Sequence, residues 1–211
     1  MAADRAGALD RAAKRAVDVA LSAIGLGLLL PAWGLLALAI KLEDGGPVFF
    51  AQERWGEGQR TIRVRKFRSM AVHAADRAVQ AVAGDRRITR VGRLMRATAL
   101  DESPQLLNIF MGEMSFVGPR VLPINEIQAR ERDAALPDDA IPGFELRCAV
   151  PPGLTGLAQL YAPRDVPRRQ KFRYDSLYVR RRSVWLDLRL IALSIFVSIT
   201  GQWQRRGDNN H

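Results

Sequence analysis

Two adjacent carboxylates, Asp101 and Glu102, stand directly before a predicted helix and are the residues best suited to chemistry. We expect Ser103 at the helix N-cap and Pro104 at the first helical position, with an apolar run that ends at Gly112. A helix start favours anions, which suits a site that handles phosphates. Neighbouring side chains there point about 100° apart, so one carboxylate can attack phosphorus while the other holds a metal ion. The alternative is a solvated acidic pair that only supports the helix.

Basic side chains surround this pair in the sequence. Lys66 and Arg68 fall on one face of an extended strand, so both can reach the same phosphate group, although two solvated bases would show the same pattern. Arginines recur every three residues from Arg90 to Arg96 and form one stripe if that segment is helical. The stripe can neutralise a diphosphate or rest against lipid headgroups, and the second role suits Arg96, the nearest to Asp101, least well.

Two glycine-containing loops follow. Gly118 and Pro119 predict a strand-to-loop turn that projects Arg120, whose fork of N–H groups pairs well with phosphate oxygens. Residues 152–159 form a second tight loop that, taken alone, is an ordinary turn.

Composition restricts the partners. The chain has 211 residues, with 32 Lys and Arg against 22 Asp and Glu, so a net charge of +10 indicates an anionic partner. No recognised nucleic-acid motif occurs and few aromatic residues lie near the basic runs, which argues against nucleic acid. The single cysteine, Cys148, cannot form an internal disulfide, which suits a cytosolic location. With only two histidines, any metal should be a hard ion held by oxygen, and Mg²⁺ is the first choice.

Residues 19–40 are apolar apart from Ser22 and are long enough to cross a bilayer. The run is too long for a signal peptide and no cleavage site follows it. Pro31 lies in its middle and can kink a helix, so the segment either spans the membrane or enters and leaves on one face. Basic residues flank both ends, a pattern that the re-entrant form predicts.

The following segment predicts a small mixed part. Residues 45–47 break the first helix, and residues 48–54 and 61–67 read as two strands of a hairpin. Beyond it we expect a helix that Ser69 caps and that runs to residue 84, a helix over residues 124–136, and an irregular stretch over residues 136–152.

The last apolar segment covers residues 184–204. Only about ten of its residues are uninterrupted, too few to span a bilayer. It therefore reads either as an interfacial helix anchored by Trp185 and Trp203 or as a buried core helix. Residues 205–211 read as a disordered tail.

Several motifs occur together in a characteristic order. They are Lys14-Arg15-Ala16-Val17-Asp18, Lys66-Phe67-Arg68-Ser69-Met70, Leu100-Asp101-Glu102-Ser103-Pro104-Gln105-Leu106, Met114-Ser115-Phe116-Val117-Gly118-Pro119-Arg120, the loop of residues 152–159, and the run of residues 171–179 with Asp175. From about Lys14 to Arg189 the chain thereby resembles the monotopic bacterial phosphoglycosyl transferases, which begin glycan assembly on polyprenyl phosphate.

That resemblance implies transfer of a sugar 1-phosphate from a nucleotide diphosphate sugar, usually UDP-linked, to undecaprenyl phosphate. It assigns Asp101 as the nucleophile and Glu102 as its partner at a Mg²⁺ site. It also carries over the charged active-site positions Lys66, Arg96, Arg120 and Asp175. A carboxylate attacks an anionic diphosphate only when charge is neutralised, and we expect Asp101 to stay ionised among these bases.

The implied architecture is α+β in a single domain over residues 1–211. Its parts are a re-entrant membrane helix broken at Pro31 over residues 14–42, a catalytic part with a short β-hairpin over residues 43–183, an interfacial helix over residues 184–204 and the tail. The resemblance places the protein in the bacterial inner membrane with its catalytic part facing the cytoplasm. A homodimer is one candidate assembly.

Four residues depart from the family pattern. They are Leu30 before the helix-breaking proline, Val121 after the arginine of the first glycine loop, Pro151 before the second loop and Leu157 within it. These changes leave the nucleophile intact but bear on the sugar that is recognised. A catalytically silent scaffold of a glycan assembly complex is the alternative function, and the intact Asp101–Glu102 pair argues against it.

Overall fold

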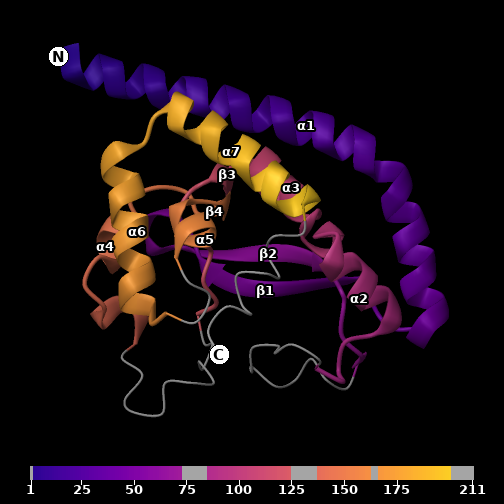
Figure 1. The fold of residues 1–211 in the computed structure, drawn as a ribbon. Helices are drawn as coiled ribbons and strands as arrows, with labels where there is room; N and C mark the ends of the chain where they lie inside the picture. Colours follow the sequence, from indigo (N-terminus) through magenta and orange to yellow (C-terminus); the bar gives the residue numbers. More distant parts are fainter. Residues whose placement is uncertain (1, 73–84, 125–136, 163–165, 201–211) are drawn as a thin grey trace.

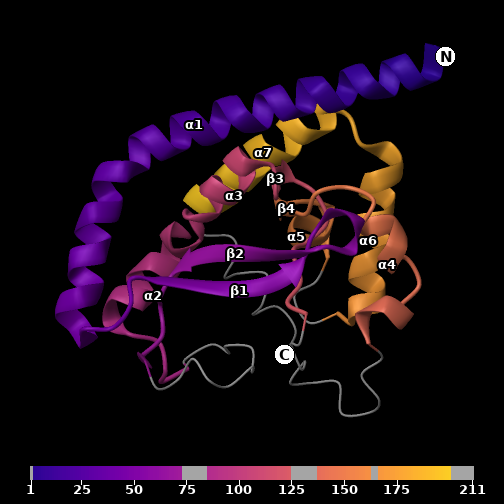
Figure 2. The same cartoon turned by 180° about the vertical axis from the view of Figure 1, so that it is seen from behind.

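The computed structural model describes residues 2–72, 85–124, 137–162 and 166–200. The architecture is α+β, with a long bent helix along the outside of a small mixed body (Figures 1 and 2). The predicted helix over residues 124–136, most of the one that was to follow Ser69, and the tail over residues 205–211 lie outside the described residues.

Helix α1 (Ala2–Asp44) is one helix with Pro31 inside it, and it includes the predicted membrane segment over residues 14–42. It ends as predicted, since Gly45 has a φ of +71°, in the left-handed region. The stretch Asp10–Asp44 is long and apolar enough, by length and composition, to cross a membrane. A helical proline leaves one backbone carbonyl without its N–H partner, which permits bending. Figure 1 shows α1 as a bent rod whose limbs follow two sides of the same body.

The predicted hairpin is confirmed. Strand β1 (Phe49–Trp55) pairs antiparallel with β2 (Thr61–Phe67) across the short turn η1 (Glu57–Gln59). On β2, Val64 is buried against the helix that follows the acidic pair. The hairpin is thereby fixed to the helix that directly follows the turn of the candidate nucleophile.

The expectation that Ser69 starts a helix is wrong. Met70 pairs with Ile88 in an isolated β-bridge, so the chain stays extended just after β2. The Ser69 hydroxyl accepts a hydrogen bond from Arg96 instead of capping a helix. Sequence alone could not reveal this, because Ile88 lies beyond a long intervening segment.

The acidic pair lies in a short turn between two short helices. Helix α2 (Arg90–Ala97) is followed by the 3₁₀ turn η3 (Leu100–Glu102) and helix α3 (Gln105–Met111). Helix α3 ends at Gly112 as predicted, with a φ of +87°. Its buried face, Leu106 and Ile109, packs on Val64 of β2.

The two glycine loops form one unit. Strand β3 (Ser115–Val117) pairs in parallel with β4 (Gly153–Thr155), so the second loop is more than an isolated turn. A Cβ atom on Gly153 would overlap the backbone nitrogen of Gly118, and one on Gly156 would overlap the Gly118 carbonyl oxygen. The loops approach this closely because both are built from glycine.

The remaining elements complete the body. The stretch predicted to be irregular contains two short helices, η4 (Asp138–Ala140) and α4 (Phe144–Arg147). They are followed by α5 (Leu157–Tyr161), α6 (Arg168–Arg181) and α7 (Val184–Ile199). Val117, Tyr178 and Leu190 belong to one buried cluster that joins β3 to the last two helices.

Two backbone groups of β3 form hydrogen bonds with side chains from other elements. The Asp18 carboxylate accepts a hydrogen bond from the Phe116 N–H at 3.0 Å. The Val117 carbonyl accepts hydrogen bonds from Lys14 Nζ at 3.0 Å and from the Tyr178 hydroxyl at 2.9 Å. The N-terminal motif of residues 14–18 therefore ties α1 to the strand that leads to Arg120.

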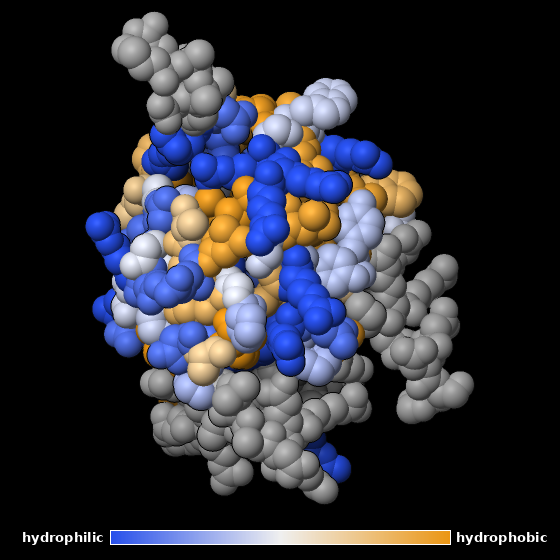
Figure 3. Space-filling model, turned by 90° about the vertical axis from the view of Figure 1, so that its left-hand side faces the viewer, coloured by the Kyte–Doolittle hydropathy of each residue, from blue (hydrophilic) through white to orange (hydrophobic). Residues whose placement is uncertain are grey.

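The outer faces of α1 and α7 are apolar and exposed. On α1 the exposed side chains are Ile24, Leu28, Leu30, Leu35, Leu38 and Leu42, and on α7 they are Trp185, Leu188, Ile195 and Phe196. The opposite side of α7 is buried at Leu190 and Val197, and an interfacial position for its exposed side stays a prediction. Trp203, one of the two predicted anchors, lies outside the described residues. Figure 3 shows hydrophilic side chains lying across an apolar surface on the side of the molecule that carries α6.

Candidate active site

The acidic pair lies in η3, between α2 and α3, as the sequence predicts. Ala99 enters the turn with a φ of +56°, a left-handed conformation that is uncommon for a residue with a side chain. Ser103 does not cap α3, which is a correction. Its hydroxyl donates to the Leu100 carbonyl at 2.7 Å and accepts from Trp33 Nε1 at 3.0 Å, so helix α1 contacts the turn directly.

Lys66 on β2 forms an ion pair with Glu102. The backbone that carries Lys66 is fixed by the buried Asn108 of α3, whose side chain accepts from the Arg65 N–H at 3.2 Å and donates to the Arg63 carbonyl at 2.8 Å. Strand β2 and helix α3 therefore hold the lysine and the acidic turn at a defined separation.

Arg96 reaches the site from the last turn of α2. That helix approaches the end of the hairpin closely, since a Cβ atom on Gly92 would overlap the Ser69 carbonyl oxygen. Arg96 Nε donates to the Ser69 hydroxyl at 2.8 Å, and the guanidinium charge opposes the rise in the pKa of Asp101 that burial causes.

Arg120 is presented by a loop that a buried ion pair fixes. The Arg120 N–H donates to Asp175 Oδ1 at 3.4 Å, and Arg147 Nε donates to Asp175 Oδ2 at 3.0 Å. Arg147 also donates to the Arg120 carbonyl. Asp175 and Arg147 are buried, whereas the Arg120 side chain is exposed and acts electrostatically on Glu102.

The two carboxylates experience opposite electrostatic environments. Partial burial and the Glu102 charge raise the pKa of Asp101 above its usual range, although Lys66 and Arg96 oppose the shift. Desolvation also raises the pKa of Glu102, but Lys66, Arg120 and Arg54 outweigh it, so that pKa lies below its usual range. That Asp101 stays ionised among the neighbouring bases remains a prediction, since burial and the Glu102 charge oppose Lys66 and Arg96 at this carboxyl.

The structure brings Lys66, Arg96 and Arg120 around the acidic pair but places two other predicted residues elsewhere. Arg68 is buried against Asp44 and donates to the Pro47 carbonyl at 2.6 Å, because β2 ends at Phe67 and the alternation of faces stops there. Asp175 faces Arg147 and the backbone of Arg120.

The carboxylate oxygens of Asp101 and Glu102 suit a hard cation that is also coordinated by oxygens of a bound phosphate. In the part of the chain that the structure describes, no group of three or more acidic, histidine or cysteine side chains could hold a metal alone. Asp101 and Glu102 are nevertheless adjacent, and burial together with the Glu102 charge raises the pKa of Asp101. Mg²⁺ is commonly held by one or two carboxylates plus phosphate oxygens, so these two residues fit it.

Sequence reasoning missed four residues that build the site. Asn108 lay unnoticed in the apolar run of α3, where a polar side chain among leucines was a usable signal. Arg54, which donates to the Val121 carbonyl at 2.8 Å, and Arg147 gave no signal among so many arginines. Trp33 was hidden within the apolar segment.

Comparisons with known proteins identify the family. The model of a family described as bacterial sugar transferase matches residues 9–201. The chain is 40% identical over 189 residues to the UDP-glucose:undecaprenyl-phosphate glucose-1-phosphate transferase of Klebsiella pneumoniae, which covers 87% of this chain and 39% of that protein. It is 40% identical over 199 residues to the exopolysaccharide production protein PSS of Rhizobium leguminosarum bv. phaseoli, covering 91% of this chain and 98% of that protein.

A third relative carries a different sugar in its name. The UDP-N-acetylgalactosamine-undecaprenyl-phosphate N-acetylgalactosaminephosphotransferase of Aeromonas hydrophila is 36% identical over 192 residues, which are 89% of this chain and 44% of that protein. The chain thus spans about two fifths of the Klebsiella and Aeromonas relatives and nearly all of the Rhizobium one. The family match includes every residue of the candidate site, and the chain belongs to the bacterial sugar transferase family.

Proposed function

We propose that the protein transfers a sugar 1-phosphate from a nucleotide diphosphate sugar, a UDP-sugar in the first instance, to undecaprenyl phosphate. The observation that carries this proposal is the acidic turn at Asp101 and Glu102, with Lys66, Arg96 and Arg120 around it. The names of the relatives support it, because they describe UDP-sugar:undecaprenyl-phosphate transferases.

Two displacements at phosphorus account for the arrangement. A carboxylate oxygen of Asp101 attacks the phosphorus that bears the sugar, and the bond to the bridging oxygen breaks, so that UMP leaves with the electron pair of that bond. Undecaprenyl phosphate then attacks the same phosphorus through an oxygen. The aspartyl-phosphosugar bond breaks, the product is the lipid diphosphate sugar, and Asp101 is again a carboxylate.

The basic side chains have separate tasks. Arg120, presented on its rigid loop, and Lys66 offset the charge of the diphosphate as it approaches the acidic turn. Arg96 opposes the rise in the Asp101 pKa and so favours the attacking form. Glu102 and Asp101 would hold Mg²⁺, which supplies further charge neutralisation when bound.

The same proposal includes a membrane location. Helix α1 would enter the bacterial inner membrane and return at Pro31, with the catalytic part facing the cytoplasm. Contacts from both limbs support this: Lys14 and Asp18 before Pro31, and Trp33 after it, all contact the same body. The exposed apolar face of α1 suits lipid, and a lipid acceptor requires a centre close to the membrane.

The test is release of nucleoside monophosphate. Detergent-purified protein with undecaprenyl phosphate is screened against UDP-sugars, and one of them should give UMP and a lipid-linked sugar. Chelation of divalent cations should abolish release, and Asp101→Asn should be inactive while it still fractionates with membranes. A chain that gives no UMP with any nucleotide sugar would instead be a scaffold of the same fold.

A further inference from the structure

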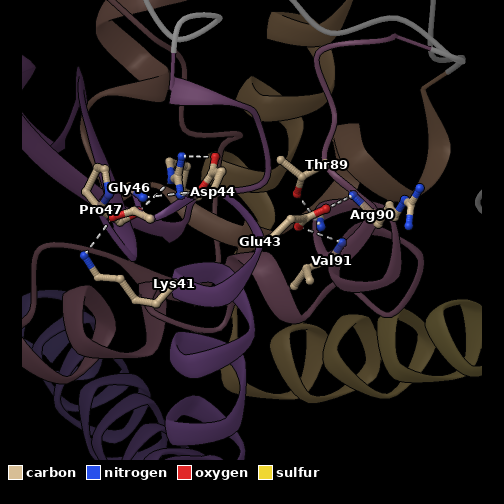
Figure 4. A network of polar contacts seen from close by, with 11 residues as sticks. Lys41, Glu43, Asp44, Gly46, Pro47, Thr89, Arg90 and Val91 are labelled. Carbon is tan, nitrogen blue, oxygen red and sulfur yellow. Dashed lines mark hydrogen bonds and ion pairs between the residues drawn. The ribbon is translucent and has the colours of Figure 1, made fainter.

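The C-terminal end of α1 holds the N-terminus of α2. The Glu43 carboxylate accepts hydrogen bonds from the Arg90 N–H at 2.6 Å and from the Val91 N–H at 3.1 Å (Figure 4). The Thr89 hydroxyl accepts the next one, from the Gly92 N–H at 2.9 Å. The first two free N–H groups of α2 are therefore satisfied by a residue 47 positions earlier in the chain, on another helix.

The next residue of α1 holds a second element. Both Asp44 oxygens bind the buried Arg68 guanidinium, one of them at 2.6 Å from Nη1, and Arg68 Nε donates to the Pro47 carbonyl at 2.6 Å. The hydrogen bonds from Arg68 keep the pKa of Asp44 below its usual range. Arg68 directly precedes Ser69, and Asp44 thereby fixes the segment that carries the Ser69 hydroxyl.

These two elements meet at Arg96. Helix α2 carries Arg96 in its last turn, and the Ser69 hydroxyl accepts the hydrogen bond from Arg96 Nε at 2.8 Å. The contact between Gly92 and the Ser69 carbonyl brings the two elements together. The helix that carries Arg96 is thus bound to the end of α1 through Glu43. The segment that carries the Ser69 hydroxyl is bound to the same end through Asp44.

We propose that Glu43 and Asp44 are positioning residues that set Arg96 against Asp101, so that the placement of the C-terminal limb of α1 controls the arrangement of the acidic site. The expected effect on kcat/KM rests on the proposed function, whereas the positioning of Arg96 does not. The outer side of this limb is apolar and exposed, with 72% of Leu35 and 78% of Leu42 accessible. Lipid that packs against the limb would then affect the position of Arg96 through the Glu43 and Asp44 carboxylates.

The physical reason is the length of α2. With eight residues it is too short to be a stable helix alone, so its orientation depends on capping and tertiary contacts. A glutamine at position 43 has the same size but only one acceptor oxygen, so it can satisfy one of the two N–H groups. We expect Glu43→Gln to let α2 fray and to loosen the placement of Arg96 without removing any group that contacts substrate.

A double-mutant cycle separates positioning from general stability. Glu43→Gln should lower kcat/KM for the nucleotide sugar roughly tenfold, about the effect of losing a helix cap. In an Arg96→Ala background the same change should have little further effect, because Glu43 acts through Arg96. The control is Glu57→Gln, an exposed glutamate on the hairpin turn, which should match the wild type. Losses that multiply in the double variant, or an unchanged Glu43→Gln enzyme, would overturn the inference.

Amide hydrogen exchange tests the same claim without turnover. Glu43→Gln should increase exchange across residues 90–102 relative to the wild type, and Glu57→Gln should not. Unchanged exchange in that segment contradicts the inference even if no nucleotide sugar is turned over. An inactive wild type with the expected exchange pattern would instead count against the proposed function alone.

Discussion

At the scale of single residues, the site separates two adjacent carboxylates by their electrostatic environments. Burial and a like charge raise the pKa of Asp101, whereas Lys66, Arg120 and Arg54 bring the pKa of Glu102 below its usual range. Oppositely shifted pKa values are typical of neighbouring acids with different tasks. Glu102 is thus suited to a permanent charge beside a cation, and Asp101 to forming and breaking a bond.

Removing either of two bases should impair turnover without unfolding the protein. Lys66→Ala and Arg120→Ala should each lower kcat/KM by roughly 10²-fold, since each side chain offsets charge during phosphoryl transfer. The matched control is Arg63→Ala, an exposed base on the other face of β2, which should retain activity. Full activity in both site variants would mean that the cluster does not stabilise the transferring group.

The sequence predicts the residues of the candidate site better than the residues that hold them in place. Lys66 lies near the end of the predicted strand β2 and Arg96 in the last turn of α2, and both act electrostatically on Asp101. Arg68, predicted from the face of its strand, and Asp175, carried over from the family, do not contact the acidic pair in the structure. Each is instead held by a buried or partly buried partner from a distant part of the chain, and no local pattern indicates such a partner.

At the scale of elements, close backbone contacts between glycines align the loop of Arg120. Strands β3 and β4 are only three residues long, so the approach of Gly118 to Gly153 and Gly156 defines the junction. Local propensity predicted the hairpin and α3, because both are built from neighbouring residues. It could not predict the parallel pairing of two loops about 35 residues apart in the sequence, since that contact requires the whole fold.

A methyl group at this junction should be destabilising. Gly153→Ala places a Cβ atom on the Gly118 backbone, where no side chain can move aside, and should cost about 1–3 kcal/mol or more. Thermal unfolding in detergent should show a lower Tm. Gly27→Ala in α1 is the control, because nothing lies within 4 Å of that Cβ position. Equal Tm values for the two variants would show that the junction is not closely packed.

At the scale of the whole molecule, α1 joins an exposed apolar surface to the acidic site. Its limb before Pro31 contacts β3 through Asp18 and Lys14, and its limb after Pro31 contacts Ser103 through Trp33. Figure 2 shows both limbs following the outline of the same body. The apolar composition and Pro31 could be read from the sequence, but not the fact that both limbs pack on one body.

Cysteine labelling tests the re-entrant topology. After Cys148→Ala, single cysteines at Asp10 and Glu57 should react with an impermeant thiol reagent from the same side of oriented vesicles, the cytoplasmic one. Pro31→Ala should tend to straighten α1 and produce molecules with opposite accessibility. If the two positions label from opposite sides in the otherwise unaltered chain, α1 spans the membrane and the hairpin is wrong.

The central claim is that Asp101 becomes covalently phosphoglycosylated, and peptide mass spectrometry tests it most directly. Without undecaprenyl phosphate, enzyme given its nucleotide sugar should release up to one equivalent of nucleoside monophosphate. The peptide that contains Asp101 should gain the mass of one phosphosugar, and Asp101→Asn should show neither event. If the wild type forms no adduct and releases monophosphate only after the lipid acceptor is added, the lipid phosphate attacks directly and the two-step account is contradicted.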